Sequence, residues 1–282
     1  SDPVVLLRLC SGGARERGES MCGIAGIVRI GARPLPGPEV ARAMAAAIGH
    51  RGPDQRGEFR DDDVHLVATR LAIQDLEHGD QPVSSRSGRS VAVYNGEIYC
   101  FRALARELES RGCELGSSGD TIVLPYLYEW LGDRLTERLR GMYAFAIWDR
   151  KERSLLLCRD RLGIKPLYLA RTGDYFLFAS EIKALLASGL IAAEIDRDAL
   201  DDLFSLSYPC PPRTMFRGVE ELRPAHRLRV RAGRGPDTPE RYWRAPFVPR
   251  GEHLRISRRD AEMELRARLR EKVEDHLQAD VP

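Results

Sequence analysis

The sequence predicts an α+β fold, in which layers of antiparallel β-sheet are covered by helices. Short apolar, strand-like runs are separated by polar or glycine-containing turns, which is the spacing of antiparallel sheets. Segments with apolar residues three to four positions apart, typical of amphipathic helices, lie among these runs and after them. This mixture favours sheet layers with helices on their faces. With 282 residues and 43% apolar composition, the chain can bury a core of ordinary size.

The first structured element is expected where the polar, glycine-rich stretch 1–20 ends. Residues 21–28 are small and apolar and predict a β-strand. An alanine-rich segment begins at Pro38, and because proline suits the first turn of a helix, we expect a helix over residues 38–48. The turn-forming string His-Arg-Gly-Pro-Asp at 50–54 then ends it.

The middle of the chain continues with strands, helices and strands again. Strands are expected at 64–68 and 91–94, and helical segments at 101–111 and 121–130. Four more short β-like segments follow, and their spacing predicts an antiparallel meander that forms a second sheet layer. These segments are residues 142–148, 155–158, 167–170 and 176–179.

The last part of the chain is expected to be mainly helical and irregular. Helices are expected at 181–187 and 197–206, and the Pro/Arg/Gly-rich stretch 223–252 predicts connection and surface loop. Residues 257–277 predict a long amphipathic helix, for which Ser257 can serve as the N-cap. The apolar face of this helix is expected to consist of Met263, Leu265, Leu269, Val273 and Leu277.

Composition excludes several classes of function. The net charge is only +2 although 30% of the residues are charged, so we expect no nucleic-acid partner and no anionic membrane surface. The six cysteines are widely spaced, without a C-x-x-C pair or clustered histidines, so neither a metal site nor a disulfide framework is expected. A reducing cytoplasm fits this pattern best. The apolar run at 4–9 is too short for a signal peptide, and no apolar stretch is long enough to span a membrane.

Cys22 is the first candidate for chemistry because it follows Met21 at the beginning of a predicted strand. If the preceding residues are removed, the chain begins with a residue that carries both a thiol and a free α-amine. The pKa of a free α-amine is about 7.7–8.0 and that of a thiol about 8.5, so the neutral amine can accept the thiol proton. On spacing alone, a buried structural cysteine is the more common interpretation.

Asn95 and Gly96 follow a predicted strand and bring a side-chain amide and a backbone N–H close together. These groups are the components of an oxyanion hole. Asn-Gly is also the commonest short turn signal, so alone the pair favours a hairpin or a strand-to-helix turn. Glu97, the next residue, fits a solvated surface position equally well.

Two further charged residues are candidates for binding a substrate. Arg70 follows an apolar run and can bind a carboxylate bidentately, although a surface arginine is the default interpretation. Asp120 stands just before a predicted helix, where an N-cap is the ordinary role of an aspartate.

Taken in order, the motifs resemble the class II glutamine amidotransferase domain of glutamine-dependent asparagine synthetases. The resemblance is dense from residue 21 to about residue 225, and it continues to the end of the sequence. The strings that carry it are Met-Cys-Gly-Ile at 21–24, His-Arg-Gly-Pro-Asp at 50–54, Arg-Leu-Ala-Ile at 70–73, Asn-Gly-Glu-Ile-Tyr at 95–99, Gly-Asp at 119–120, Gly-Met-Tyr-Ala-Phe-Ala at 141–146, Arg-Asp-Arg-Leu-Gly-Ile-Lys-Pro-Leu-Tyr at 159–168 and Phe-Ala-Ser-Glu-Ile-Lys-Ala-Leu at 178–185.

The resemblance implies an N-terminal-nucleophile hydrolase fold, a four-layer αββα sandwich with two antiparallel sheets. It implies that Cys22 attacks the side-chain amide of glutamine with its own α-amine as the base, and that Asn95 and Gly96 form the oxyanion hole. Arg70 would bind the α-carboxylate of glutamine. The α-ammonium would be held by Glu97 and Asp120, and the remaining glutamine-binding positions would be Leu71, Ala72 and Ile73.

The resemblance also implies a domain organisation. Residues 1–21 would be an upstream extension that is absent or removed in the active form, and residues 22–225 the glutaminase domain. Residues 226–256 would be a linker, and 257–282 the first helix of a synthetase domain. The glutaminase domain needs no cofactor, whereas ATP, Mg and aspartate would belong to the synthetase domain, whose Ser-Gly-Gly-x-Asp-Ser phosphate loop does not occur in these residues. Relatives often pair, so a homodimer is also expected.

Three functions remain open at this stage. The first is glutamine hydrolysis that supplies ammonia for asparagine synthesis, in which case the enzyme is a ligase that uses glutamine as amido donor. The second keeps the glutaminase but delivers the ammonia to another acceptor. The third is a glutamine-binding regulatory module without turnover, because Cys22 has no free amine while residues 1–21 are attached.

Overall fold

The computed structural model describes residues 21–252 and 255–277, which form two antiparallel sheets and the helices that flank them. The predicted extension over residues 1–20 lies outside the described residues. The strand order of the first sheet is β10-β8-β9-β1-β3-β2. Its strands are β1 (Gly23–Arg29), β2 (Gln55–Arg60), β3 (Val64–Arg70), β8 (Tyr168–Thr172), β9 (Tyr175–Ala179) and β10 (Val219–Glu221).

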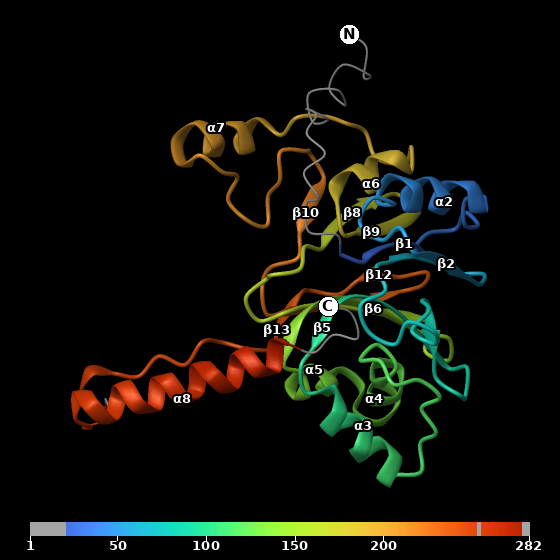
Figure 1. Cartoon of the computed structure of the whole chain (residues 1–282). Helices are drawn as coiled ribbons and strands as arrows, with labels where there is room; N and C mark the ends of the chain where they lie inside the picture. The colour runs from blue at the N-terminus through green and yellow to red at the C-terminus, as the bar shows by residue number, and fades with distance from the viewer. Residues whose placement is uncertain (1–20, 253–254, 278–282) are drawn as a thin grey trace.

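The second sheet lies face to face with the first (Figure 1). Its order is β12-β11-β7-β6-β5-β4, and β13 pairs with β11 as well. Its strands are β4 (Val83–Ser84), β5 (Ser90–Ile98), β6 (Gly141–Asp149), β7 (Ser154–Arg159), β11 (His226–Arg231), β12 (Gly235–Pro236) and β13 (Glu240–Arg241).

Helices cover the outer face of each sheet, so that the layers follow the order helix, sheet, sheet, helix (Figure 1). The first sheet is covered by α2 (Pro38–Ala47) and α6 (Ile182–Ala187). The second is covered by α3 (Phe101–Ser110), α4 (Val123–Leu131) and α5 (Leu135–Arg138), with the short helix η1 (Gly132–Arg134) between the last two. The predicted α+β class and the αββα sandwich are both confirmed.

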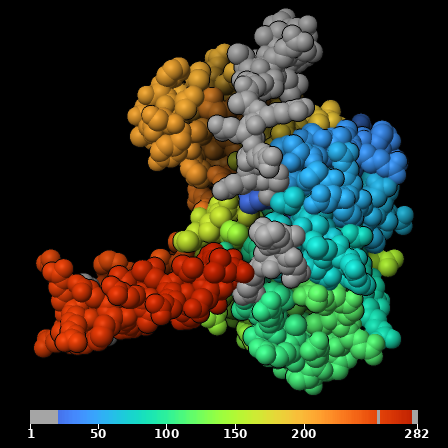
Figure 2. Space-filling model, viewed as in Figure 1, coloured from blue at the N-terminus to red at the C-terminus, as the bar shows by residue number. Residues whose placement is uncertain are grey.

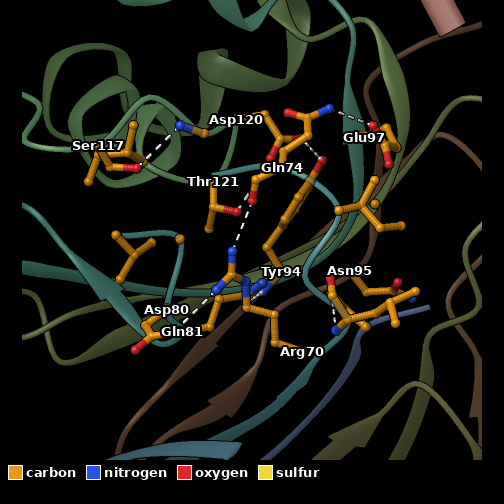
Figure 3. A pocket seen from close by; sticks show the side chains of 18 of the residues that line it. Arg70, Gln74, Asp80, Gln81, Tyr94, Asn95, Glu97, Ser117, Asp120 and Thr121 are labelled. Atoms are coloured by element: carbon orange, nitrogen blue, oxygen red, sulfur yellow. Dashed lines mark hydrogen bonds and ion pairs between the residues drawn. The ribbon is translucent and has the colours of Figure 1, made fainter. Parts of the chain in front are cut away.

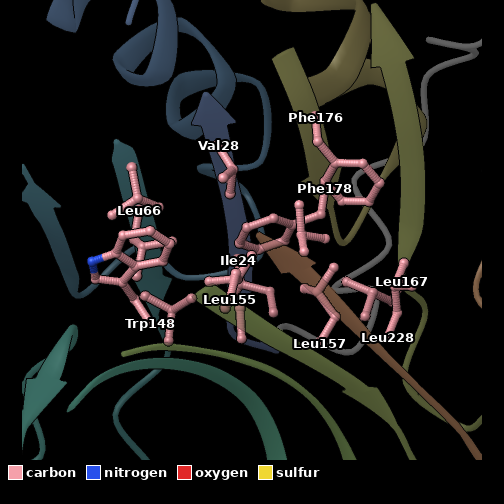
Figure 4. Packing of buried hydrophobic residues seen from close by; sticks show 14 of the residues in the cluster. Ile24, Val28, Leu66, Trp148, Leu155, Leu157, Leu167, Phe176, Phe178 and Leu228 are labelled. Atoms are coloured by element: carbon pink, nitrogen blue, oxygen red, sulfur yellow. The ribbon is translucent and has the colours of Figure 1, made fainter. Parts of the chain in front are cut away.

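The alternation of side chains along each strand explains the layering. In β1, Ile24 and Val28 point into the core between the sheets, whereas Ala25 and Ile27 pack under the helices of the first sheet. This period of two is the rule for a strand that is buried on both faces. Figure 4 shows the inter-sheet core, where Trp148 from the second sheet lies close to Leu66 from the first.

The predicted meander is wrong in one respect. Residues 142–148 and 155–158 lie in the adjacent strands β6 and β7 of the second sheet. Residues 167–170 and 176–179 instead contribute to the hairpin β8–β9 in the first sheet. The four segments are thus two hairpins in different sheets, because spacing along the chain reports local turns and not the sheet that a hairpin joins.

The expectation of connection and surface loop over residues 223–252 is also wrong for part of that stretch. Residues 226–231 form β11, which pairs antiparallel with β7. Leu228 and Val230 are buried in the inter-sheet core, while the arginines that alternate with them lie on the other face. The stretch that the sequence assigned to a linker over 226–256 therefore contributes the strands β11, β12 and β13 to the second sheet.

The C-terminal helix is confirmed. It is α8 (Arg258–His276), and Ser257 caps it by accepting a hydrogen bond from the backbone N–H of Asp260 at 3.1 Å. The helix projects from the rest of the molecule, and its C-terminal end is the end nearest to the sheets (Figure 2). None of its side chains is buried, and the predicted apolar face is more than half exposed at every position. Two further helices are α7 (Arg197–Leu206) and η2 (Arg250–Glu252).

No helix among the described residues is both long and apolar enough to cross a membrane.

Candidate active site

A cavity brings together nearly all of the residues that the sequence singled out (Figure 3). Of the predicted site residues, those that line it are Cys22, Arg70, Leu71, Ile73, Asn95, Gly96, Glu97 and Asp120. Ala72 is the exception, because it is absent from the lining and its backbone N–H donates to Asp54 Oδ2 at 2.9 Å. Segments that are distant in sequence thus meet at one place.

Cys22 directly precedes β1, and its thiol lies beside Leu71, the residue that follows β3. The backbone N–H of Leu71 donates to Cys22 Sγ at 3.4 Å. Burial raises the pKa of the thiol, and the hydrogen bond from Leu71 offsets this only in part. A thiol in this position requires a base to become a nucleophilic thiolate.

Arg51, which sequence reasoning did not assign to the site, holds the backbone of Cys22 and is itself held by Glu181. Arg51 Nε donates to the carbonyl oxygen of Cys22 at 3.1 Å, and its Nη1 pairs with Glu181 at 2.9 Å. Both belong to strings that carry the family resemblance, His-Arg-Gly-Pro-Asp and Ser-Glu-Ile-Lys-Ala-Leu. Their place in those strings was the available signal, but nothing in the spacing indicates that they meet.

Asn95 is the single asparagine of the sequence and is fully buried. It lies inside β5, opposite Ala144 of β6, so the expected turn at Asn95-Gly96 is wrong. Neither its Oδ1 nor its Nδ2 has a hydrogen-bond partner among the described residues. Because an unpartnered buried amide costs about 1–3 kcal/mol, this side chain is arranged for a ligand rather than for stability.

Gly96 must be glycine because β6 approaches it closely. A Cβ atom at this position would lie 2.2 Å from the carbonyl oxygen of Met142 and 2.7 Å from the Cα of Tyr143. Any side chain would therefore force β5 and β6 apart and displace Asn95 with them.

Arg70 is a buried cation in the lining of the cavity. It ends β3 and is 5% exposed, so the default interpretation as a surface arginine is wrong. Its Nη2 donates to the carbonyl oxygens of Gln74 and Asp75 at 2.9 and 2.6 Å, and its Nη1 pairs with Asp80 at 3.2 Å. These contacts fix the direction in which the guanidinium faces the cavity.

Two carboxylates lie elsewhere in the lining. Asp120 is buried and accepts hydrogen bonds from Tyr94 Oη at 2.6 Å and from the backbone N–H of Ile98 at 2.8 Å. It does not cap a helix, since α4 has Ile122 at its N-cap position. Glu97 accepts a hydrogen bond from Gln74 Nε2 at 2.9 Å.

The surroundings of both carboxylates raise their pKa values. Burial, followed by the charge of Asp120, raises the pKa of Glu97 to about 7, while the charge of Lys165 acts in the opposite direction. Burial also raises the pKa of Asp120. A cationic group of a ligand bound beside these two carboxyl groups would stabilise their charged forms.

Lys165 is a further lining residue that the sequence placed in a motif without a role. It is 3% exposed, and its Nζ lies 2.6 Å from the sulfur of Met21. Burial lowers the pKa of its ammonium group, and the charge of Glu97 opposes that shift. Within residues 21–252 and 255–277, no group of three or more His, Cys, Asp or Glu side chains could hold a metal ion.

The αββα sandwich with two facing antiparallel sheets is the fold of N-terminal-nucleophile hydrolases. Residues 21–243 match the family model described as the glutamine amidotransferase domain, and the chain belongs to this family. The match extends past β11, in agreement with the place of that strand in the second sheet.

Several curated relatives carry the name of asparagine synthetase, among them the following two. The chain is 39% identical over 212 residues to the glutamine-hydrolysing asparagine synthetase 3 of Bacillus subtilis, a match that covers 74% of this chain and 34% of the relative. It is 35% identical over 282 residues to a putative glutamine-hydrolysing asparagine synthetase of Mycobacterium bovis, covering 93% of this chain and 43% of the relative. The chain thus spans less than half the length of these relatives.

Solved structures confirm the fold. The glutamine phosphoribosylpyrophosphate amidotransferase of B. subtilis superimposes with a TM-score of 0.56 at 20% identity, covering 79% of this chain and 49% of that one. A structure described as the allosteric regulatory enzyme of purine biosynthesis gives a TM-score of 0.57 at 21% identity, with the same coverage. At this level of identity the likeness concerns the fold alone.

Proposed function

We propose that this chain hydrolyses glutamine to glutamate and ammonia, with Cys22 as the nucleophile. The observation that carries the proposal is the unpartnered amide of Asn95, buried in the cavity that Cys22 also lines. An amide donor that has no structural partner and shares a cavity with a thiol is suited to an oxyanion that exists only during the reaction.

The zwitterionic end of glutamine gives roles to the charged residues. Arg70 binds the α-carboxylate and is called here the carboxylate clamp. Glu97 and Asp120 bind the α-ammonium and together form the ammonium clamp. A substrate held at both charged groups presents its side-chain amide to the thiol in a near-attack arrangement.

The chemistry requires that the α-amine of Cys22 be free. Once residues 1–21 are removed, the neutral amine accepts the proton of Sγ, and Sγ attacks the amide carbon of glutamine. Asn95 Nδ2 and the backbone N–H of Gly96 stabilise the oxyanion. The ammonium of Cys22 then protonates the leaving nitrogen, ammonia departs, and water hydrolyses the thioester to release glutamate.

We further propose that the ammonia is used for ATP-dependent amidation of aspartate to asparagine. The names of these two relatives support this acceptor. ATP, Mg and aspartate would bind to parts of the relatives that the 282 residues do not match, and a homodimer is part of the same proposal. The cysteines of the described residues, Cys22, Cys100, Cys113, Cys158 and Cys210, are free thiols, which supports a reducing cytoplasm.

The test is glutamate release from glutamine by the chain with the amine of Cys22 freed, compared with its Cys22→Ala variant. Steady release by the first form and none by the second is expected. Equal release by the two forms would exclude Cys22 as the nucleophile.

One observation favours a second function, a glutamine-binding module without turnover. Met21 precedes Cys22, so in a form that keeps Met21 the nitrogen of Cys22 is an amide and cannot act as a base, while Arg70, Glu97 and Asp120 still line the cavity. Glutamine binding measured by calorimetry, without release of glutamate, would identify this function.

A further inference from the structure

The loop between β3 and β4, residues 71–82, contributes most of its residues to the lining of the cavity, but Asp75 is not among them. Asp75 is nevertheless buried, with 8% of its surface exposed. A buried carboxylate needs hydrogen-bond donors around it, so the groups that donate to Asp75 indicate its structural role.

The hydrogen-bond donors to one oxygen of Asp75 come from a different segment of the chain, the turn at residues 117–119. The hydroxyl of Ser117 donates to Oδ2, and so do the backbone N–H groups of Ser118 at 3.0 Å and Gly119 at 3.3 Å. Asp120 is the next residue of the chain. Asp75 therefore holds the turn that presents one half of the ammonium clamp.

The other contacts of Asp75 belong to the loop and to the carboxylate clamp. Its Oδ1 accepts from the backbone N–H of His78 at 3.1 Å, and its carbonyl oxygen accepts from Arg70 Nη2 at 2.6 Å. One residue thus contacts the guanidinium of Arg70 with its backbone and the turn before Asp120 with its side chain.

The charge of Asp75 suits this role. Burial raises the pKa of its carboxyl, but the hydrogen bonds from Ser117, His78, Ser118 and Gly119 outweigh burial and keep the pKa below its usual range. The group is therefore an ionised acceptor at neutral pH, and hydrogen bonds to an ionised acceptor are shorter and stronger than those to a neutral one.

We propose that Asp75 is a positioning residue that fixes the separation of the carboxylate clamp and the ammonium clamp, and thereby the preference of the site for an amide that bears an α-amino acid group. This inference deepens the proposed function and rests on it. Asp75 acts through Arg70 and Asp120 and does not touch the substrate.

Asp75→Asn is the informative substitution. Asparagine has nearly the same size and tolerates the left-handed backbone of this position, where φ is 47°. It offers only one acceptor oxygen, so either the turn 117–119 or the N–H of His78 faces an amino group instead. The measurement is steady-state hydrolysis of glutamine and of glutaramate, which is glutamine without its α-ammonium, by the chain with Cys22 freed.

The KM for glutamine is expected to rise about 10- to 100-fold, while kcat changes less than about threefold. The preference for glutamine over glutaramate should fall by a similar factor, because only glutamine uses the ammonium clamp. Ser117→Ala, which removes one of the three donors to Oδ2, should shift both quantities in the same direction by less.

Asp62→Asn is the matched control, since Asp62 is exposed and does not line the cavity. It should leave both substrates unaffected. A purely structural role for Asp75 would lower kcat for both substrates equally, at unchanged KM and unchanged preference, and that result would overturn the inference.

The failure of the proposed function can be told apart from the failure of this inference. If the unsubstituted chain releases no glutamate, the proposed function fails, and Asp75 is then tested by calorimetry of glutamine binding in the Cys22→Ala background. A Kd that Asp75→Asn leaves unchanged there, or an absence of binding by the parent, overturns the inference. A Kd raised at least about tenfold supports it.

Discussion

Asn95→Ala should separate catalysis from stability. If Asn95 Nδ2 stabilises the oxyanion, its removal lowers kcat by about 10²–10³, which corresponds to about 2.7–4 kcal/mol of transition-state stabilisation. No hydrogen bond among the described residues is lost, because both polar atoms of the side chain are unpartnered. Removing a desolvated, unsatisfied amide returns about 1–3 kcal/mol, which offsets the packing lost with its side-chain atoms.

The thermal midpoint of Asn95→Ala should therefore stay within about 3 °C of the parent while kcat collapses. Gln81→Ala provides the contrast, because Gln81 is also a buried amide of the cavity but its Oε1 accepts from the backbone N–H of Tyr94 at 2.7 Å. That variant should lose about 1–3 kcal/mol of stability. The assays are glutamate release and differential scanning fluorimetry. A marked loss of stability in Asn95→Ala, with kcat within about threefold of the parent, would refute the reasoning.

Three further predictions concern binding, positioning and the fold. Because the pKa of Glu97 is raised to about 7, its negative charge is lost as the pH falls through that value, so KM for glutamine should rise about tenfold per unit below it. Glu97→Gln should remove this pH dependence of KM. If KM of the variant still rises at low pH, another group is responsible. Arg51→Met should lower kcat more than it raises KM, because Arg51 holds the carbonyl of Cys22; an unchanged kcat would exclude that role. Leu228→Ala should lower the free energy of unfolding, measured with urea, by about 2–5 kcal/mol. Leu269→Ala, on the exposed helix α8, should lower it by less than about 0.5 kcal/mol. Similar losses in the two variants would contradict the place of β11 in the core.

Much of the site could be predicted because each part of glutamine needs its own kind of group. A thiol, an amide donor, a cation and two carboxylates stand in motifs whose order resembles one family, and the cavity contains all of them. Local patterns could not decide whether each of these residues has a role in the site or the ordinary structural role that its position also fits. Asn95 and Gly96 fit a turn by composition, yet long-range pairing with β6 places them inside a strand.

The parts that the sequence did not predict depend on contacts between distant segments. In β11, arginines alternate with Leu228 and Val230, so a stretch of high charge conceals a strand with one buried face. The assignment of the hairpin β8–β9 to the first sheet depends on its pairing with β1, which no local spacing reports. The donors to Oδ2 of Asp75 lie more than forty residues away, at 117–119.

The most direct test of the proposed mechanism compares two forms of the chain, one beginning at Cys22 and one keeping residues 1–21, each verified by N-terminal sequencing. Glutamate release from glutamine is measured for both at neutral pH. The proposed role of the α-amine predicts turnover by the form that begins at Cys22 and none by the form in which Met21 remains attached. Equal turnover by the two forms, with the extension intact, would contradict it.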